Sequence, residues 1–72
     1  MKAGNSEAAL AQLREALYLQ PDDPAIHEQV GDLELARGRT AEAGAAYRSA
    51  LQYAVDGDAR RRVRTKMRRG GV

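Results

Sequence analysis

Residues 4–23 read GNSEAALAQLREALYLQPDD, and residues 38–57 read GRTAEAGAAYRSALQYAVDG. When the two stretches are aligned at a shift of 34 residues, identical residues fall on one another at Gly4/Gly38, Ala9/Ala43, Ala11/Ala45, Arg14/Arg48, Ala16/Ala50, Leu17/Leu51 and Asp22/Asp56. A fixed period of this length is the sequence signature of a helical repeat array. Because such arrays serve mainly as extended binding surfaces, the period predicts a chain that holds other molecules.

Size and charge narrow the choice of function further. The 72 residues include no cysteine, which excludes a disulfide framework and a thiolate metal site. No apolar run resembles a secretory signal or a membrane span, so we expect a soluble, cytoplasmic protein without a membrane partner. Residues 1–57 carry nine acidic and five basic side chains, whereas residues 58–72 carry one acidic and seven basic ones. The sequence therefore predicts an acidic body followed by a basic tail.

Helix start and stop signals divide the chain into four predicted helices. The first begins with Ser6 as N-cap and ends near Leu19. The second has Asp23 as N-cap and Pro24 at its first position, and it ends at Gly38 in a left-handed conformation.

The third and fourth predicted helices follow the same logic. Thr40 caps the third, which ends before residues 56–57, and Asp58 caps the fourth. The apolar faces predicted for the four helices are Ala9, Leu10, Leu13, Ala16 and Leu17; then Ile26, Val30 and Leu33; then Ala43, Ala46, Tyr47, Ala50, Leu51 and Ala54; and finally Ala59, Val63 and Met67.

Residues 24–57 resemble a complete tetratricopeptide repeat (TPR). His27 stands at the family's first aromatic position, Val30-Gly31 at its Leu-Gly pair, and Ala43, Tyr47 and Ala50 at the positions of its second helix. The resemblance implies an all-α fold of antiparallel helical-hairpin repeats with about four helices in a single domain. Residues 4–23 are then the second helix of a partial repeat, 24–57 the full repeat, 58–69 a basic terminal helix and 70–72 a frayed tail.

The chain departs from the family pattern at several positions. Glu34 replaces a tyrosine and His27 an aromatic residue, so we expect weaker packing of the second helix, and Val55 stands where the family has proline. In the third unit, packing positions are occupied by Arg61, Arg64, Thr65 and Arg68. The fourth helix is therefore expected to be a terminal helix with one side on the third helix and the other in water.

The exposed side of the first helix leaves two hypotheses. Either the chain is the C-terminal piece of a longer array, or a second copy covers this side. For the second case, a homodimer, the candidate self-association residues are Leu10, Leu13 and Leu17.

The resemblance implies that the second helix lines a concave partner-binding face. Its residues would be Ala25, Glu28, Gln29, Asp32, Leu35 and Ala36. Glu28 and Asp32 would make this face acidic, which favours a basic or amphipathic peptide or a partner helix. The alternative is that both acids simply lie on a solvated helix face.

Three interpretations of the basic terminal helix remain open. Its cations are Arg60, Arg61, Arg62, Arg64, Lys66, Arg68 and Arg69. They could bind nucleic acid or another polyanion, although no aromatic side chain accompanies them to stack on bases. They could instead only solvate the helix, or Arg62, Lys66 and Arg69 could pair with the acidic second helix.

No residue set in the sequence predicts catalysis, a metal site or a cofactor. His27 is the single histidine and is expected to be a packed or capped side chain, and the hydroxyl residues lack a neighbouring base. We therefore expect a non-enzymatic protein–protein interaction module that binds a peptide, a partner helix or another protomer. Nucleic-acid or polyanion binding through the basic helix is the alternative.

Overall fold

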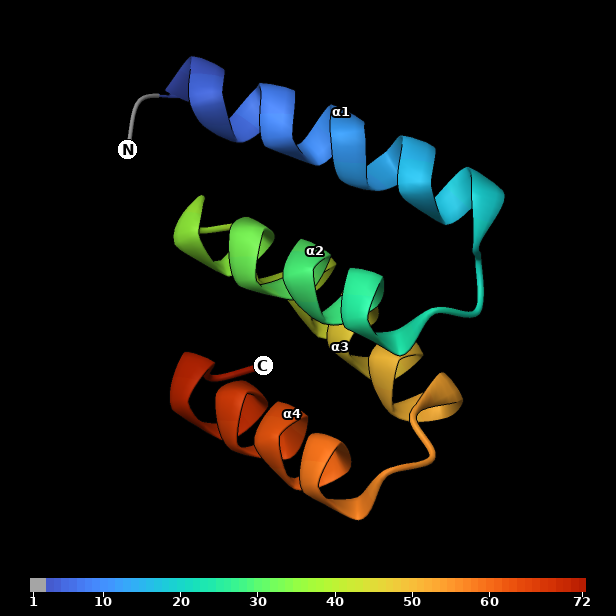
Figure 1. The fold of residues 1–72 in the computed structure, drawn as a ribbon. Coiled ribbons are helices and arrows are strands. Elements are labelled where there is room, and N and C mark those ends of the chain that lie inside the picture. Colours follow the sequence, from blue (N-terminus) through green and yellow to red (C-terminus); the bar gives the residue numbers. More distant parts are fainter. Residues whose placement is uncertain (1–2) are drawn as a thin grey trace.

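The computed structural model describes residues 3–72, with side chains from Asn5 onward, and they form four α-helices: α1 (Ala3–Leu19), α2 (Pro24–Ala36), α3 (Thr40–Tyr53) and α4 (Gly57–Gly70). Successive helices run in opposite directions, so that α2 and α4 point the same way (Figure 1). Helices α1 and α4 lie at the two ends of the array, and α3 passes behind α2. The predicted all-α architecture of four packed helices is confirmed.

The boundaries of α2 follow the predicted signals. Asp23 accepts a hydrogen bond from the amide of Ala25 at 2.9 Å, and Pro24 occupies the first turn. At the other end Gly38 has φ +77°, its amide donates to Leu35 O at 3.0 Å, and the amide of Arg39 donates to Glu34 O at 2.9 Å. These two bonds form a Schellman motif, which satisfies carbonyl groups that the helix end would otherwise leave free.

The predicted N-caps of the other three helices are wrong. Helix α1 already begins at Ala3, so Ser6 lies in its second turn, where its side chain is buried. The helix can extend over residues 3–5 because none of them is proline, and Gly4 costs only about 1 kcal/mol relative to alanine. Arg39 rather than Thr40 is the N-cap of α3, without a side-chain cap bond. Asp56 rather than Asp58 caps α4, because its carboxylate accepts from the amide of Asp58 and its carbonyl from that of Arg60.

A second Schellman motif ends α4 within residues 70–72, where the sequence predicts a frayed tail. Gly71 has φ +71°, its amide donates to Arg68 O, and the amide of Val72 donates to Met67 O at 3.0 Å. The Val72 side chain packs against the core. A hydrophobic contact of this kind commonly accompanies the motif, and it holds the end of the chain against the helices.

The core lies where α3 meets α2 and α4. Ala43, Tyr47, Ala50 and Val63 are at most 1% exposed, and the partly buried Leu35, Leu51, Met67 and Val72 surround them. A Cβ atom added at Gly31 would lie 2.5 Å from Tyr47 Cε1, so only glycine lets α2 approach the tyrosine ring this closely. The predicted apolar faces are confirmed for Ala43, Tyr47 and Ala50 on α3 and for Val63 and Met67 on α4.

Glu34 and His27, which replace family aromatics, both make specific contacts. Glu34 is 3% exposed and accepts a hydrogen bond from Arg37 at 2.9 Å, while Arg37 also reaches Glu7 on α1 at 2.6 Å. His27 Nε2 lies 2.8 Å from Pro21 O, and its ring stacks on Tyr53. The expected loss of packing is therefore offset by a polar link from α2 to α1 and by a ring contact to α3.

Candidate partner-binding groove

Helices α2 and α4 are joined by a cluster of ion pairs. Arg62 Nε and Nη2 each donate to a different oxygen of Glu28 at 2.8 Å. Lys66 Nζ lies 2.7 Å from Glu28 Oε2 and 2.9 Å from Asp32 Oδ2. Glu28 and Arg62, like Asp32 and Lys66, are 34 residues apart. The sequence period thus sets the parallel register of α4 on α2.

The ion pairs also determine the protonation of these groups. The Glu28 side chain is nearly buried, and the hydrogen bond from Arg62, supported by that from Lys66, lowers the pKa of Glu28 to about 2 despite its burial. Burial alone would lower the pKa of Lys66, but its bonds to Glu28 and Asp32 outweigh this effect and raise it. Both carboxylates of the predicted acidic face therefore have cationic partners.

The structure separates the seven basic residues of α4 into two groups. Arg60 donates to the carbonyls of Leu51 and Ala54 at the end of α3, and Arg61 lies 3.5 Å from Asp58. Arg62 and Lys66 pair with α2, which confirms for these two residues the interpretation that the basic helix pairs with the acidic second helix. Within the described chain, no ion pair involves the remaining cations, Arg64, Arg68 and Arg69.

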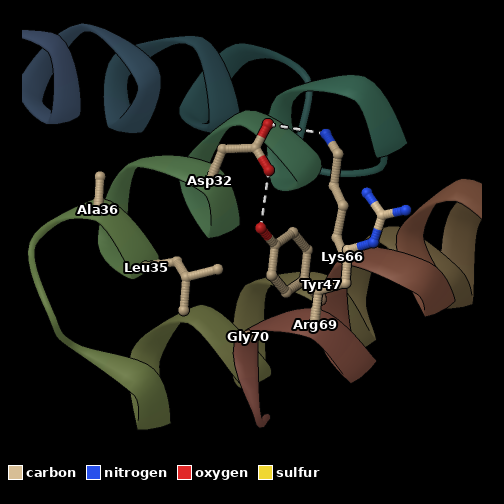
Figure 2. Close-up of a pocket in the computed structure, with 7 residues that line it drawn as sticks. All are labelled: Asp32, Leu35, Ala36, Tyr47, Lys66, Arg69 and Gly70. Atoms are coloured by element: carbon tan, nitrogen blue, oxygen red, sulfur yellow. Dashed lines mark hydrogen bonds and ion pairs between the residues drawn. The ribbon is translucent and has the colours of Figure 1, made fainter.

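A groove of about 440 Å³ opens between the same two helices (Figure 2). Its lining consists of Asp32, Leu35, Ala36, Tyr47, Lys66, Arg69 and Gly70. The hydroxyl of Tyr47 donates to Asp32 at 2.7 Å, and burial together with this bond raises the pKa of Tyr47. A Cβ atom at Gly70 would lie 2.7 Å from Leu35 Cδ2, so the glycine lets the end of α4 approach α2.

The predicted concave residues are divided among three hollows. Asp32 and Leu35 line the groove described above. Gln29 lines a hollow of about 300 Å³ between α1 and α2, and Ala25 and Glu28 line a small one of about 100 Å³ next to Arg62. Glu28 is thus occupied by the chain's own α4 rather than open to a partner.

Lys66, Arg69 and Gly70 belong to the groove but were not predicted there. They follow Asp32, Leu35 and Ala36 by one repeat length. Carrying the predicted concave positions forward by one period would have found them.

The predicted self-association residues also differ from one another in exposure. Leu10 is 3% exposed and is already packed within the chain. Leu13 and Leu17 are half-buried. Only this part of the predicted surface remains accessible on α1.

Comparison of the chain with protein-family models, curated proteins and solved structures gives no match. In the described part of the chain, no group of three or more histidine, aspartate and glutamate side chains is placed to hold a metal ion. None of the helices in residues 3–72 combines the length and the apolar character needed to cross a membrane.

Proposed function

We propose that the chain is a TPR-like protein–protein interaction module that holds a peptide or partner helix in the groove between α2 and α4. Three observations support this function: the 34-residue period, the antiparallel helices, and an open hollow lined by apolar side chains with a few charged groups. A hollow of that composition is the usual form of a binding site.

The observation that carries the proposal is the guanidinium of Arg69, which has no ion pair within residues 5–72, beside the apolar side chains of the groove. The sequence predicts an acidic face, but Glu28 and Asp32 form ion pairs with Arg62 and Lys66, which balance their charge. Leu35 and Ala36 offer apolar contact, and Arg69 leaves a guanidinium available to the ligand. We therefore assign to the groove an amphipathic segment that places an apolar side chain on this floor and a carboxylate near Arg69.

A labelled-amide NMR titration tests this function. The probe is an amphipathic helical peptide with leucine and glutamate repeated at four-residue spacing, and a lysine-for-glutamate version is the matched ligand control. We expect shifts centred on Leu35, Ala36 and Arg69 with the acidic peptide only. Arg69→Gln should weaken binding, and Ala36→Trp should block it by filling the groove, whereas the exposed Arg48→Gln should leave it unchanged. Binding unaffected by both groove variants would refute the assignment.

Polyanion binding through α4 remains the second candidate. The observation in its favour is that Arg64, Arg68 and Arg69 have no ion pair within the described residues. Arg60, Arg61, Arg62 and Lys66 are occupied by contacts within the chain, which reduces the charge available to phosphates. Protein binding therefore has the stronger support.

A further inference from the structure

The face of α1 that corresponds to the best-packed face of α3 is only partly covered. Ala43, Tyr47 and Ala50 on α3 are at most 1% exposed. Their counterparts one period earlier, Ala9, Leu13 and Ala16, are half-buried, and Leu19 is 75% exposed. On α3 this face receives α2, with Gly31 against Tyr47. Within the described residues no helix lies on α1 in the equivalent way (Figure 1).

Helix α4 also has one face on which no helix packs within the described residues. Gly31, on the face that α2 turns to α3, is buried, and so is Glu34 three residues later. The equivalent α4 residues are Thr65, which is half-buried, and Arg68, which is exposed, and Arg64 beside them is exposed as well. Within residues 3–72, α1 therefore has an uncovered face of the kind that α3 turns to α2, and α4 has an uncovered face of the kind that α2 turns to α3.

We infer that two copies of this chain join head to tail, with α4 of one copy packed on α1 of the next in the way that α2 packs on α3. The inference concerns surfaces outside the α2–α4 groove and does not depend on the proposed peptide ligand. A second copy covers the exposed face of α1, and the 34-residue period that aligns helices within one chain also aligns the two copies.

Steric complementarity supports this joint. Within one chain, Gly31 of α2 contacts Tyr47 of α3. One period after Gly31 is Thr65 on α4, and one period before Tyr47 is Leu13 on α1. The joint therefore places Thr65 against Leu13 of the second copy. A larger residue replaces glycine on α4, and a smaller one replaces tyrosine on α1, so the pair keeps a similar total volume. Ala9 and Ala16 leave room for the aliphatic parts of the arginine side chains, whose charged ends can reach water at the edge.

Charge complementarity supports it as well. In an antiparallel pair, the residue before Thr65 lies level with the residues after Leu13, so Arg64 comes level with Arg14 and Glu15. Glu15 is the one nearer the joint, because its counterpart on α3, Ser49, is half-buried, whereas Arg48, the counterpart of Arg14, is exposed. Neither Arg64 nor Glu15 has an ion pair within the described residues. The joint would match these two charges, and salt should weaken it.

A heterologous contact of this kind leaves one free face at each end of a dimer. Further copies can add to these ends, so the mass grows beyond two chains or stops only when a ring closes. A two-fold dimer, by contrast, ends at two chains.

A charge-swap experiment tests the joint. The variants are Glu15→Arg and Arg64→Glu, both at exposed helical positions, and the exposed Arg48→Glu is the control. The weight-average mass of the native chain should rise with concentration at low salt above the 7.8 kDa of one chain. Each single variant should stay at that mass, because like charges then meet at the joint. An equimolar mixture of the two, or the double variant, restores opposite charges and should associate again, and Arg48→Glu should behave like the native chain.

Three results would overturn the inference. The first is a native mass that stays at one chain over the whole concentration range. The second is a mass that saturates at two chains, which indicates a two-fold dimer. The third is association that both single variants retain in full. Circular dichroism on every variant checks that the helices remain folded, so that a loss of association can be assigned to the joint.

Discussion

Glu28 and Arg62 are separated by one repeat length in the sequence and are joined by two hydrogen bonds of 2.8 Å each in the structure. Residues at the same position of successive repeats thus lie side by side on parallel helices. The repeated pattern of apolar residues weakens after residue 57, but α4 keeps the 34-residue register on α2 through its ion pairs. One side of α4 is fastened to α2 and α3, and the other, with Arg64 and Arg68, lies in water.

Glu28→Gln should destabilise the fold. The substitution removes the carboxylate that receives both Arg62 and Lys66, while the nearly buried position keeps an amide that cannot balance two cations. Solvent screens the half-exposed Arg62 and limits the effect, so we expect the free energy of unfolding to fall by about 1–3 kcal/mol. Each kcal/mol corresponds to a decrease in Tm of roughly 4–8 °C. Thermal unfolding followed by circular dichroism measures it. Glu15→Gln is the control and should change Tm little, because Glu15 is exposed and makes no ion pair with any residue that the structure describes. Equal effects of both variants would contradict this role of Glu28.

The contribution of Glu28 should depend on pH. Its pKa is lowered from 4.5 to about 2 in the folded chain, so the folded state binds its proton less readily than the unfolded state. The stabilisation is therefore complete above about pH 5 and is lost as the pH falls toward 2, by up to about 3 kcal/mol. Urea unfolding of the native chain and Glu28→Gln across this range should show the difference between them shrinking. A difference that stays constant down to pH 2 would argue against the lowered pKa.

Gly31→Ala should destabilise the fold although alanine is the better helix former. The added Cβ would lie 2.5 Å from the Tyr47 ring. The ring cannot move freely, because its hydroxyl donates a hydrogen bond to Asp32. Overpacking of this kind costs about 1–3 kcal/mol, against a gain in helix propensity of about 1 kcal/mol. Gly57→Ala is the matched control, because a Cβ there meets nothing within 4 Å. Chemical unfolding of both variants decides the matter, and a Gly31→Ala variant as stable as Gly57→Ala would disprove the close contact.

Any binding of duplex DNA through α4 should depend only modestly on salt. In the described part of the chain three cations of α4 have no ion pair, Arg64, Arg68 and Arg69. Three available cations predict a slope of about −2.7 for log K against log salt concentration, whereas seven would give about −6. Fluorescence anisotropy at several salt concentrations measures the slope. A slope near the larger value would mean that α4 gives up its contacts with α2 when it binds, and it would favour the polyanion function over the protein-binding one.

The sequence was sufficient to predict the helices and their order, because prolines, glycines and apolar spacing act locally. It was less reliable at helix starts: the sequence predicts Asp58 as the cap of the fourth helix, but Asp56, two residues earlier, makes the cap bonds. The roles of Glu34 and Val72 could not be predicted, since each depends on a partner brought close only by folding. The acidic face was uncertain for the same reason: the sequence left pairing of Arg62 and Lys66 with the second helix as one of three interpretations, and only the folded chain shows that they neutralise Glu28 and Asp32.

The register of α4 on α2 is the central claim, because the groove exists only if these helices stack as the period dictates. A double-mutant cycle with Glu28→Gln, Arg62→Gln and the double variant, measured by chemical unfolding at pH 7, tests it most directly. We predict a double variant that is more stable than the sum of the two single effects implies, with a coupling free energy that lies outside the measurement error. Strictly additive effects would contradict the contact between Glu28 and Arg62, and with it the placement of α4.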